Sequence, residues 1–131
     1  MSTELTLLGW TLVLALVQIF LAAGVTTRDV GLKYNLSARD KPVGGASELA
    51  GRLTRAQHNL FETLPLFAAA VLIAHVAGRE GGLTLRGAQL YLGARIAYLP
   101  VYALGTPILR TVIFMISIVG LVMILLAILH P

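Results

Sequence analysis

Two long apolar runs stand near the two ends of the chain. Leu5 to Val25 contains no charge and one strongly polar side chain, Gln18, and Thr111 to Leu129 contains no charge at all. Each run is about long enough to cross a hydrocarbon core of roughly 30 Å as a helix. A helix also satisfies its own backbone hydrogen bonds there. The pattern therefore predicts an integral membrane protein.

Two further helical patterns lie between these runs. We expect helices over residues 5–27, 48–77, 85–104 and 108–129. The second helix would be about 45 Å long at 1.5 Å per residue, so its first turns should protrude from the bilayer. The sequence thus predicts an all-α membrane protein, a bundle of four spanning helices in which residues 1–131 form a single domain.

The composition agrees with a membrane protein and argues against nucleic-acid binding and a metal site. The chain is 57% hydrophobic and 12% charged, whereas soluble domains carry about twice that charge. The net charge of +4 comes from basic residues beside the apolar spans, which indicates membrane topology rather than nucleic-acid binding. There is no cysteine, and no histidine has a second ligand at suitable spacing, so we expect no metal site.

The basic residues also predict orientation. The first connection and the start of the second helix hold most of them, and the third connection adds Arg110; the first group is Arg28, Lys33, Arg39, Lys41, Arg52 and Arg55. The opposite side has only Arg79 and Arg86. Because positive residues stay in the cytoplasm, the first and third connections should be cytoplasmic and both termini outside.

Polar side chains form one stripe on each of the two middle helices. Spacings of four and three residues align, on the second helix, Glu48, Arg52, Arg55, Asn59 and Glu62. The same spacings align, on the third helix, Tyr91, Arg95, Tyr98 and Tyr102. At about 100° per residue each set shares one face, and Gln57 lies on nearly the opposite face of its helix.

Arg95 sits well inside an apolar span, where an ionisable side chain costs about 3 kcal/mol on insertion scales. It needs a partner, and Glu62 or Asn59 on the second helix is the natural candidate. Such a pair is equally consistent with a structural lock between helices and with a ligand site. The tyrosines taken alone are typical of anchoring at the headgroup level.

Two prolines favour a cavity beside these stripes. Pro65 and Pro100 each remove a helical hydrogen bond and predict a kink. Several arginines in a partly desolvated cleft suit an anionic ligand, preferably one whose carboxylates a guanidinium grips in bidentate fashion. Glu62 would hold an ammonium group, and the apolar walls suit a lipophilic second ligand.

The run RAQHNLFETLP, residues 55–65, resembles the second-helix signature of the membrane-associated proteins in eicosanoid and glutathione metabolism (MAPEG). The positions that match are Arg55, Ala56, Asn59, Glu62 and Pro65. The third helix resembles the family's R-x-x-Y segment through Arg95 and Tyr98. The resemblance covers the whole chain, and it is closest to the bacterial branch of the family. Thr63 stands where some family enzymes have an aromatic residue.

The resemblance implies a homotrimer in the bacterial inner membrane, with glutathione bound in clefts between subunits that open to the cytosol. It implies a transferase or peroxidase that acts on lipophilic electrophiles or lipid hydroperoxides. The alternative is a non-catalytic lipid-binding or scaffold protein on the same fold. A four-helix drug-efflux transporter is disfavoured, because the first span holds no embedded glutamate.

The resemblance also assigns roles to individual residues. Glutathione is expected to contact residues of both stripes, namely Arg55, Asn59, Glu62, Arg95, Tyr98 and Tyr102. Gln57 is expected to reach it from the neighbouring subunit. Arg110 resembles the family arginine that stabilises the thiolate, since a nearby cation lowers the pKa of a thiol. Arg28 is expected to be a second cation.

Overall fold

The computed structural model describes residues 1–38, 45 and 47–130, and in this part of the chain every regular element is a helix. Four helices are long: α1 (Thr3–Val30), α3 (Glu48–Val76), α4 (Gly82–Ala103) and α5 (Pro107–Leu129). They overlap the four ranges expected from the hydrophobic pattern. The short helix α2 (Leu32–Asn35) was not expected, and it follows Gly31, whose φ of 89° ends α1. Arg39 and Lys41 of the predicted basic connection lie outside the described residues.

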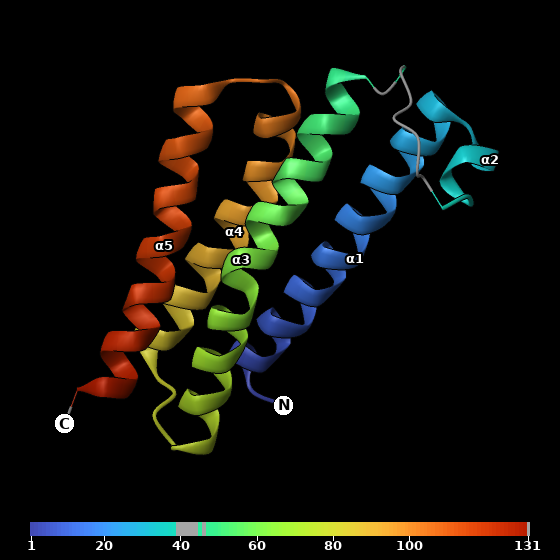
Figure 1. Cartoon of the computed structure of the whole chain (residues 1–131). Helices are drawn as coiled ribbons and strands as arrows, with labels where there is room; N and C mark the ends of the chain where they lie inside the picture. The colour runs from blue at the N-terminus through green and yellow to red at the C-terminus, as the bar shows by residue number, and fades with distance from the viewer. Residues whose placement is uncertain (39–44, 46, 131) are drawn as a thin grey trace.

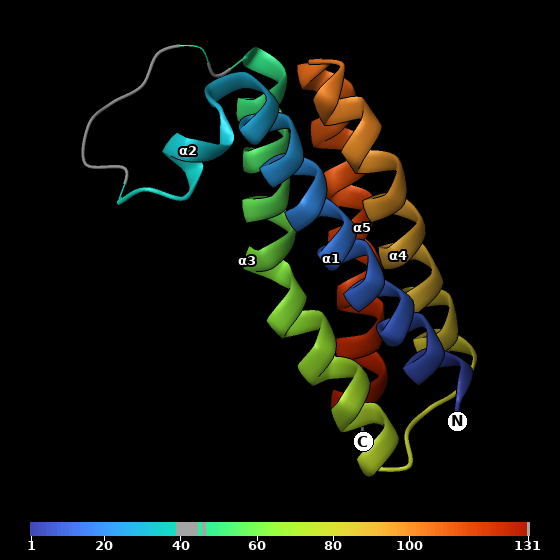
Figure 2. The same ribbon diagram turned by 90° about the vertical axis from the view of Figure 1, so that its right-hand side faces the viewer.

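The four long helices run side by side (Figures 1 and 2), and Figure 1 shows α3 and α4 between α5 and α1. α5 packs on α4 and α3, and α1 packs on α3 and α4. The end of α1, the start of α3 and the α4–α5 turn lie together at one end of the molecule, which we call the connection end. Both termini and the α3–α4 turn lie at the opposite, terminal end. This is the grouping of connections on which the predicted orientation depends.

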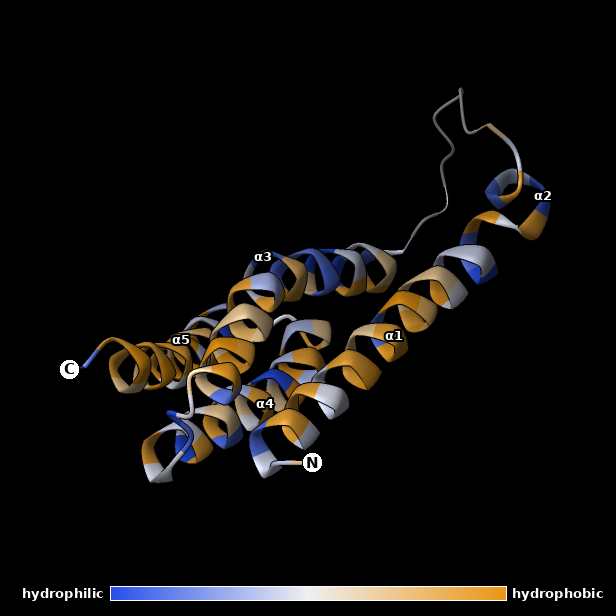
Figure 3. Ribbon diagram, turned by 90° about the horizontal axis from the view of Figure 1, so that it is seen from below, coloured by the Kyte–Doolittle hydropathy of each residue, from blue (hydrophilic) through white to orange (hydrophobic). Residues whose placement is uncertain are grey.

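Apolar side chains cover the outside of the molecule. Figure 3 shows α1 and α5 as largely hydrophobic ribbons, and large side chains such as Trp10, Phe20 and Ile108 are exposed. α1, α3 and α5 are long and apolar enough to cross a membrane. α4 is not among these candidates, because Arg86 and Arg95 lower its hydropathy. Three of the four expected spans are thus long and apolar enough to cross a membrane, and a crossing by α4 stays a prediction.

Two serines start the helices at opposite ends of the molecule. Ser2 caps α1 by accepting a hydrogen bond from the Leu5 amide (3.2 Å), and Ser47 caps α3 in the same way. Such caps satisfy amides that have no partner inside the helix. The Ser2 hydroxyl also donates to Glu80 of the α3–α4 turn (2.6 Å), which contacts His75 as well (3.0 Å). The hydroxyl and the imidazole hold the pKa of the Glu80 carboxyl below its ordinary value.

Glycines allow α4 and α5 to approach each other closely. A Cβ added to Gly120 would lie 2.6 Å from the carbonyl oxygen of Gly87, and one added to Gly87 would lie 2.6 Å from that of Gly120. Small residues permit such contact between membrane helices. The contact fixes the spacing of the two helices that carry Tyr98, Tyr102 and Arg110.

Replacing Gly120 by alanine should therefore destabilise the molecule, by about 1–3 kcal/mol for an overpacked contact. Gly93→Ala is the matched control, because a Cβ there meets nothing within 4 Å and alanine favours a helix. We expect the thermal midpoint in detergent to fall for Gly120→Ala and to stay or rise for Gly93→Ala. Equal midpoints would contradict the close contact.

Candidate functional site

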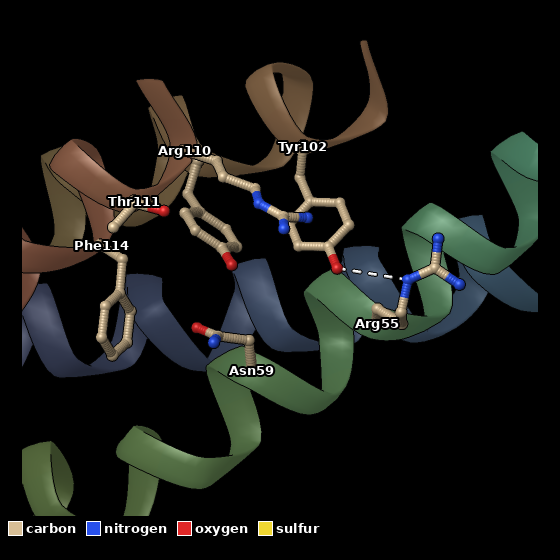
Figure 4. Close-up of a pocket in the computed structure, with 7 residues that line it drawn as sticks. Arg55, Asn59, Tyr102, Arg110, Thr111 and Phe114 are labelled. Atoms are coloured by element: carbon tan, nitrogen blue, oxygen red, sulfur yellow. Dashed lines mark hydrogen bonds between the residues drawn. The ribbon is translucent and has the colours of Figure 1, made fainter. Parts of the chain in front are cut away.

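A cavity of about 250 Å³ opens between α3, α4 and α5 near the connection end (Figure 4). Each helix contributes two lining residues four positions apart, and α5 adds Thr111; the pairs are Arg55 and Asn59, Tyr98 and Tyr102, and Arg110 and Phe114. Residues four apart share one face of a helix. Three helix faces therefore meet at this cavity, and all three bring polar groups to it.

Two arginines meet on one tyrosine at the mouth of the cavity. Arg55 donates from Nε to the hydroxyl of Tyr102 (3.2 Å). The guanidinium carbon of Arg110 lies 4.6 Å from the centre of the same ring, within the range of a cation–π contact. No carboxylate is among the described residues that line the cavity. Its charge is therefore positive, and an anionic group is the ligand it suits.

The α4–α5 turn sets the position of Arg110. Gly105 in this turn has a φ of 74°, and a Cβ there would lie 2.8 Å from the guanidinium carbon of Arg52. Arg52 also donates from Nη1 to the carbonyl of Ala103 (3.4 Å). α5 then begins at Pro107, a residue suited to the first turn of a helix. Through these contacts with Arg52, the turn holds the start of α5 against the start of α3.

A buried arginine lies behind the cavity. Arg95 is 2% exposed and donates from Nη1 to Oδ1 of Asn59 (2.6 Å). Its Nη2 donates to the carbonyl of Asn59 (3.3 Å) and to Oγ1 of Thr63 (2.9 Å). Of the two predicted partners, Asn59 is therefore the hydrogen-bonded one, whereas Glu62 makes no such bond and is exposed.

Aromatic rings surround the same guanidinium. The guanidinium carbon of Arg95 lies 4.9 Å from the ring centre of Tyr98, 5.3 Å from that of Phe114 and 5.8 Å from that of Tyr91. Contacts of this kind are worth about 2 kcal/mol when desolvated. The hydroxyl of Tyr91 lies 2.7 Å from Oγ1 of Thr63, so the tyrosine belongs to the same network. The rings and the neutral oxygens stabilise the charge without a hydrogen-bonded carboxylate.

Three of the predicted site residues lie elsewhere in the single chain. Gln57 lines a second cavity, of about 360 Å³, between α1 and α3. Arg28 is exposed at the end of α1 and pairs with Asp29 (3.1 Å). Glu62 is not among the lining residues of the first cavity. The structure thus brings together Arg55, Asn59, Tyr98, Tyr102 and Arg110, with Arg95 directly behind them.

Sequence reasoning did not select three residues that belong to this region. Phe114 follows Arg110 by four positions, and that spacing was a usable signal. Thr111 carried no such signal. Thr63 was noticed only as a departure from the family pattern, although it holds Arg95. Among the described residues, no group of histidine and acidic side chains is placed to hold a metal ion.

Comparisons with known proteins identify the family but no individual relative. Neither a curated protein nor a solved structure matches the chain. The model of the MAPEG family matches residues 7–130, nearly the whole sequence. This match and the three apolar helices make the chain an integral membrane protein of a family associated with glutathione and eicosanoid metabolism. The match includes both stripes and the cavity, and the chain belongs to the MAPEG family.

Proposed function

We propose that the chain binds glutathione in the cavity between α3, α4 and α5. In this proposal the peptide reacts there with lipophilic electrophiles or lipid hydroperoxides that arrive from the bilayer. The observation that carries the proposal is the convergence of Arg55 and Arg110 on Tyr102, in a cavity whose described lining residues include no carboxylate. Glutathione carries two carboxylates, and guanidinium groups bind carboxylates well.

In this proposal Arg110 activates the thiol of glutathione. A free thiol has a pKa of about 8.5 and is only a few per cent ionised at neutral pH. A cation beside the sulfur favours the thiolate, which attacks the electrophilic carbon and forms a carbon–sulfur bond as the leaving group departs. With a hydroperoxide, the thiolate attacks the terminal oxygen, the oxygen–oxygen bond breaks, and the alcohol leaves once protonated. The sulfenic acid formed on glutathione then condenses with a second glutathione to give the disulfide and water.

A homotrimer would complete the site. Gln57 on α3 lines the second cavity, and Arg28 at the end of α1 is exposed, so neither lines the first cavity of its own chain. A neighbouring copy that packs this surface against the cavity would add a cation and an amide to it. Glu62 is exposed in the single chain and would meet the ammonium group of glutathione at such an interface. The connection end would lie on the cytosolic side of the bacterial inner membrane, in line with the predicted orientation.

The test is glutathione binding to the detergent-solubilised chain, measured by titration calorimetry and followed by turnover with a generic aromatic electrophile. We expect saturable binding and a thiolate signal in the ultraviolet spectrum. A glutathione analogue with serine in place of cysteine is the control, since it should bind without that signal. An absence of saturable binding refutes the proposal. Binding without a thiolate signal or turnover would favour the non-catalytic alternative.

A further inference from the structure

Asn59 lines the cavity and also bonds to the buried arginine behind it. Its Oδ1 accepts the hydrogen bond from Arg95 behind the cavity (2.6 Å). Its Nδ2 has no hydrogen-bond partner among the described side chains and backbone groups, and Asn59 lines the cavity. The donor is therefore the part of this amide that remains for a ligand.

Arg95 leaves the amide no choice of orientation. A guanidinium has five N–H donors and no acceptor, so an amide turned by 180° would place donors against donors. An asparagine is otherwise free to present either oxygen or nitrogen. Because the cation is 2% exposed, water cannot replace the lost acceptor. Arg95 thus makes Asn59 a donor toward the cavity.

Thr63 and Tyr91 hold Arg95 in this position. Oγ1 of Thr63 accepts from Arg95 Nη2 (2.9 Å), and its own hydrogen has the Leu60 carbonyl (3.3 Å) as an acceptor. The Tyr91 hydroxyl, 2.7 Å away, is then the donor to Oγ1. Tyr91 stacks on Phe67 with ring centres 4.0 Å apart, so the far end of the network rests on the packed core. An aromatic residue at position 63 has no Oγ1, so the hydrogen bonds that this atom makes would be lost.

We propose that Arg95 is a positioning residue, and that Thr63 acts through it to fix Asn59 as a hydrogen-bond donor for an anionic group in the cavity. Neither Arg95 nor Thr63 lines the cavity, so both act through Asn59. The choice of ligand rests on the proposed glutathione site. The orientation of the Asn59 amide does not, and it is open to a separate test.

That test uses the side-chain amide signals of the chain labelled with ¹⁵N-asparagine. The sequence contains two asparagines, Asn35 and Asn59, so two side-chain pairs are expected. Thr63→Val and Arg95→Met should shift and broaden the Asn59 pair, while the Asn35 pair stays as the internal control. Arg95→Lys retains a donor and should restore part of the signal. An Asn59 pair that is unchanged in both Thr63→Val and Arg95→Met would overturn the proposal without any ligand present.

A double-mutant cycle tests the consequence for binding. Thr63→Val should weaken glutathione binding about 3- to 10-fold, the effect of losing one ordinary hydrogen bond, because Thr63 acts on the ligand only indirectly. In an Asn59→Ala background the same change should have no further effect, because the residue through which Thr63 acts is gone. Additive losses would overturn the positioning role. If the unmodified chain does not bind glutathione, the proposed function fails and the amide signals still decide this inference.

Discussion

We expect the replacement of Arg110 by alanine to lower glutathione turnover far more than glutathione binding. We expect turnover with an aromatic electrophile at pH 7 to fall about 10- to 100-fold, because a thiol without a nearby cation is only a few per cent ionised. The dissociation constant should change by less than a factor of about 5, the typical effect of one hydrogen bond. Steady-state kinetics and calorimetry on the same preparation measure both quantities.

The pH profile separates this role from a structural one. Without the cation the thiol ionises at higher pH, so the rate of Arg110→Ala should recover as the pH rises toward about 9. Arg110→Lys keeps a positive charge and should retain most of the activity at pH 7. Arg86→Ala is the control, because Arg86 is an exposed arginine near the terminal end of α4. A loss in Arg110→Ala that persists at alkaline pH would argue against thiolate stabilisation.

We expect the replacement of Arg55 by alanine to have the opposite effect, weakening glutathione binding far more than turnover. Arg55 lines the cavity, and its Nε donates to Tyr102 (3.2 Å); in the proposed complex its guanidinium also binds a carboxylate of glutathione. Loss of a charge-assisted bond costs about 1.5–3 kcal/mol, which corresponds to about a 10- to 100-fold weaker affinity for glutathione. Turnover at saturating glutathione should fall much less, because Arg55 is not assigned to the sulfur.

Two further variants sharpen this expectation. Arg55→Lys keeps the charge but loses the planar fork that grips a carboxylate, and an intermediate affinity is expected. Lys33→Ala removes an exposed cation from α2 at the same end of the molecule, and it should leave the affinity within a factor of about 2. If Lys33→Ala weakened binding as much as Arg55→Ala, long-range attraction would explain the effect, and a direct contact would not.

The helices were predictable because their pattern repeats over many residues. The charge-free runs in α1 and α5 are long enough for a bilayer, whatever else the chain does. The stripe of α3 was also readable, because residues three and four apart share a helix face in any fold. By contrast, α2 spans only four residues and has no periodic pattern. It depends on the positive φ of Gly31, which hydropathy does not report.

The partners of the polar residues were only partly predictable, and Arg95 shows why. Its need for a partner followed from its place in an apolar span, but the sequence left Glu62 and Asn59 as equal candidates. Adjacent positions on a stripe differ by a small rotation about the helix axis. The choice between them depends on how α3 is turned toward α4.

The amino-acid sequence by itself determined the membrane class, the long helices, the polar face of each middle helix and the family signature. The tertiary structure alone decided which faces meet. It placed Asn59 and Thr63 on Arg95, brought Arg110 and Phe114 of α5 to the same cavity, and left Gln57 and Arg28 outside it. The physical reason is that spacing along a helix specifies directions about its own axis. The rotation and distance between helices come from contacts such as that of Gly87 with Gly120, which join residues far apart in the chain.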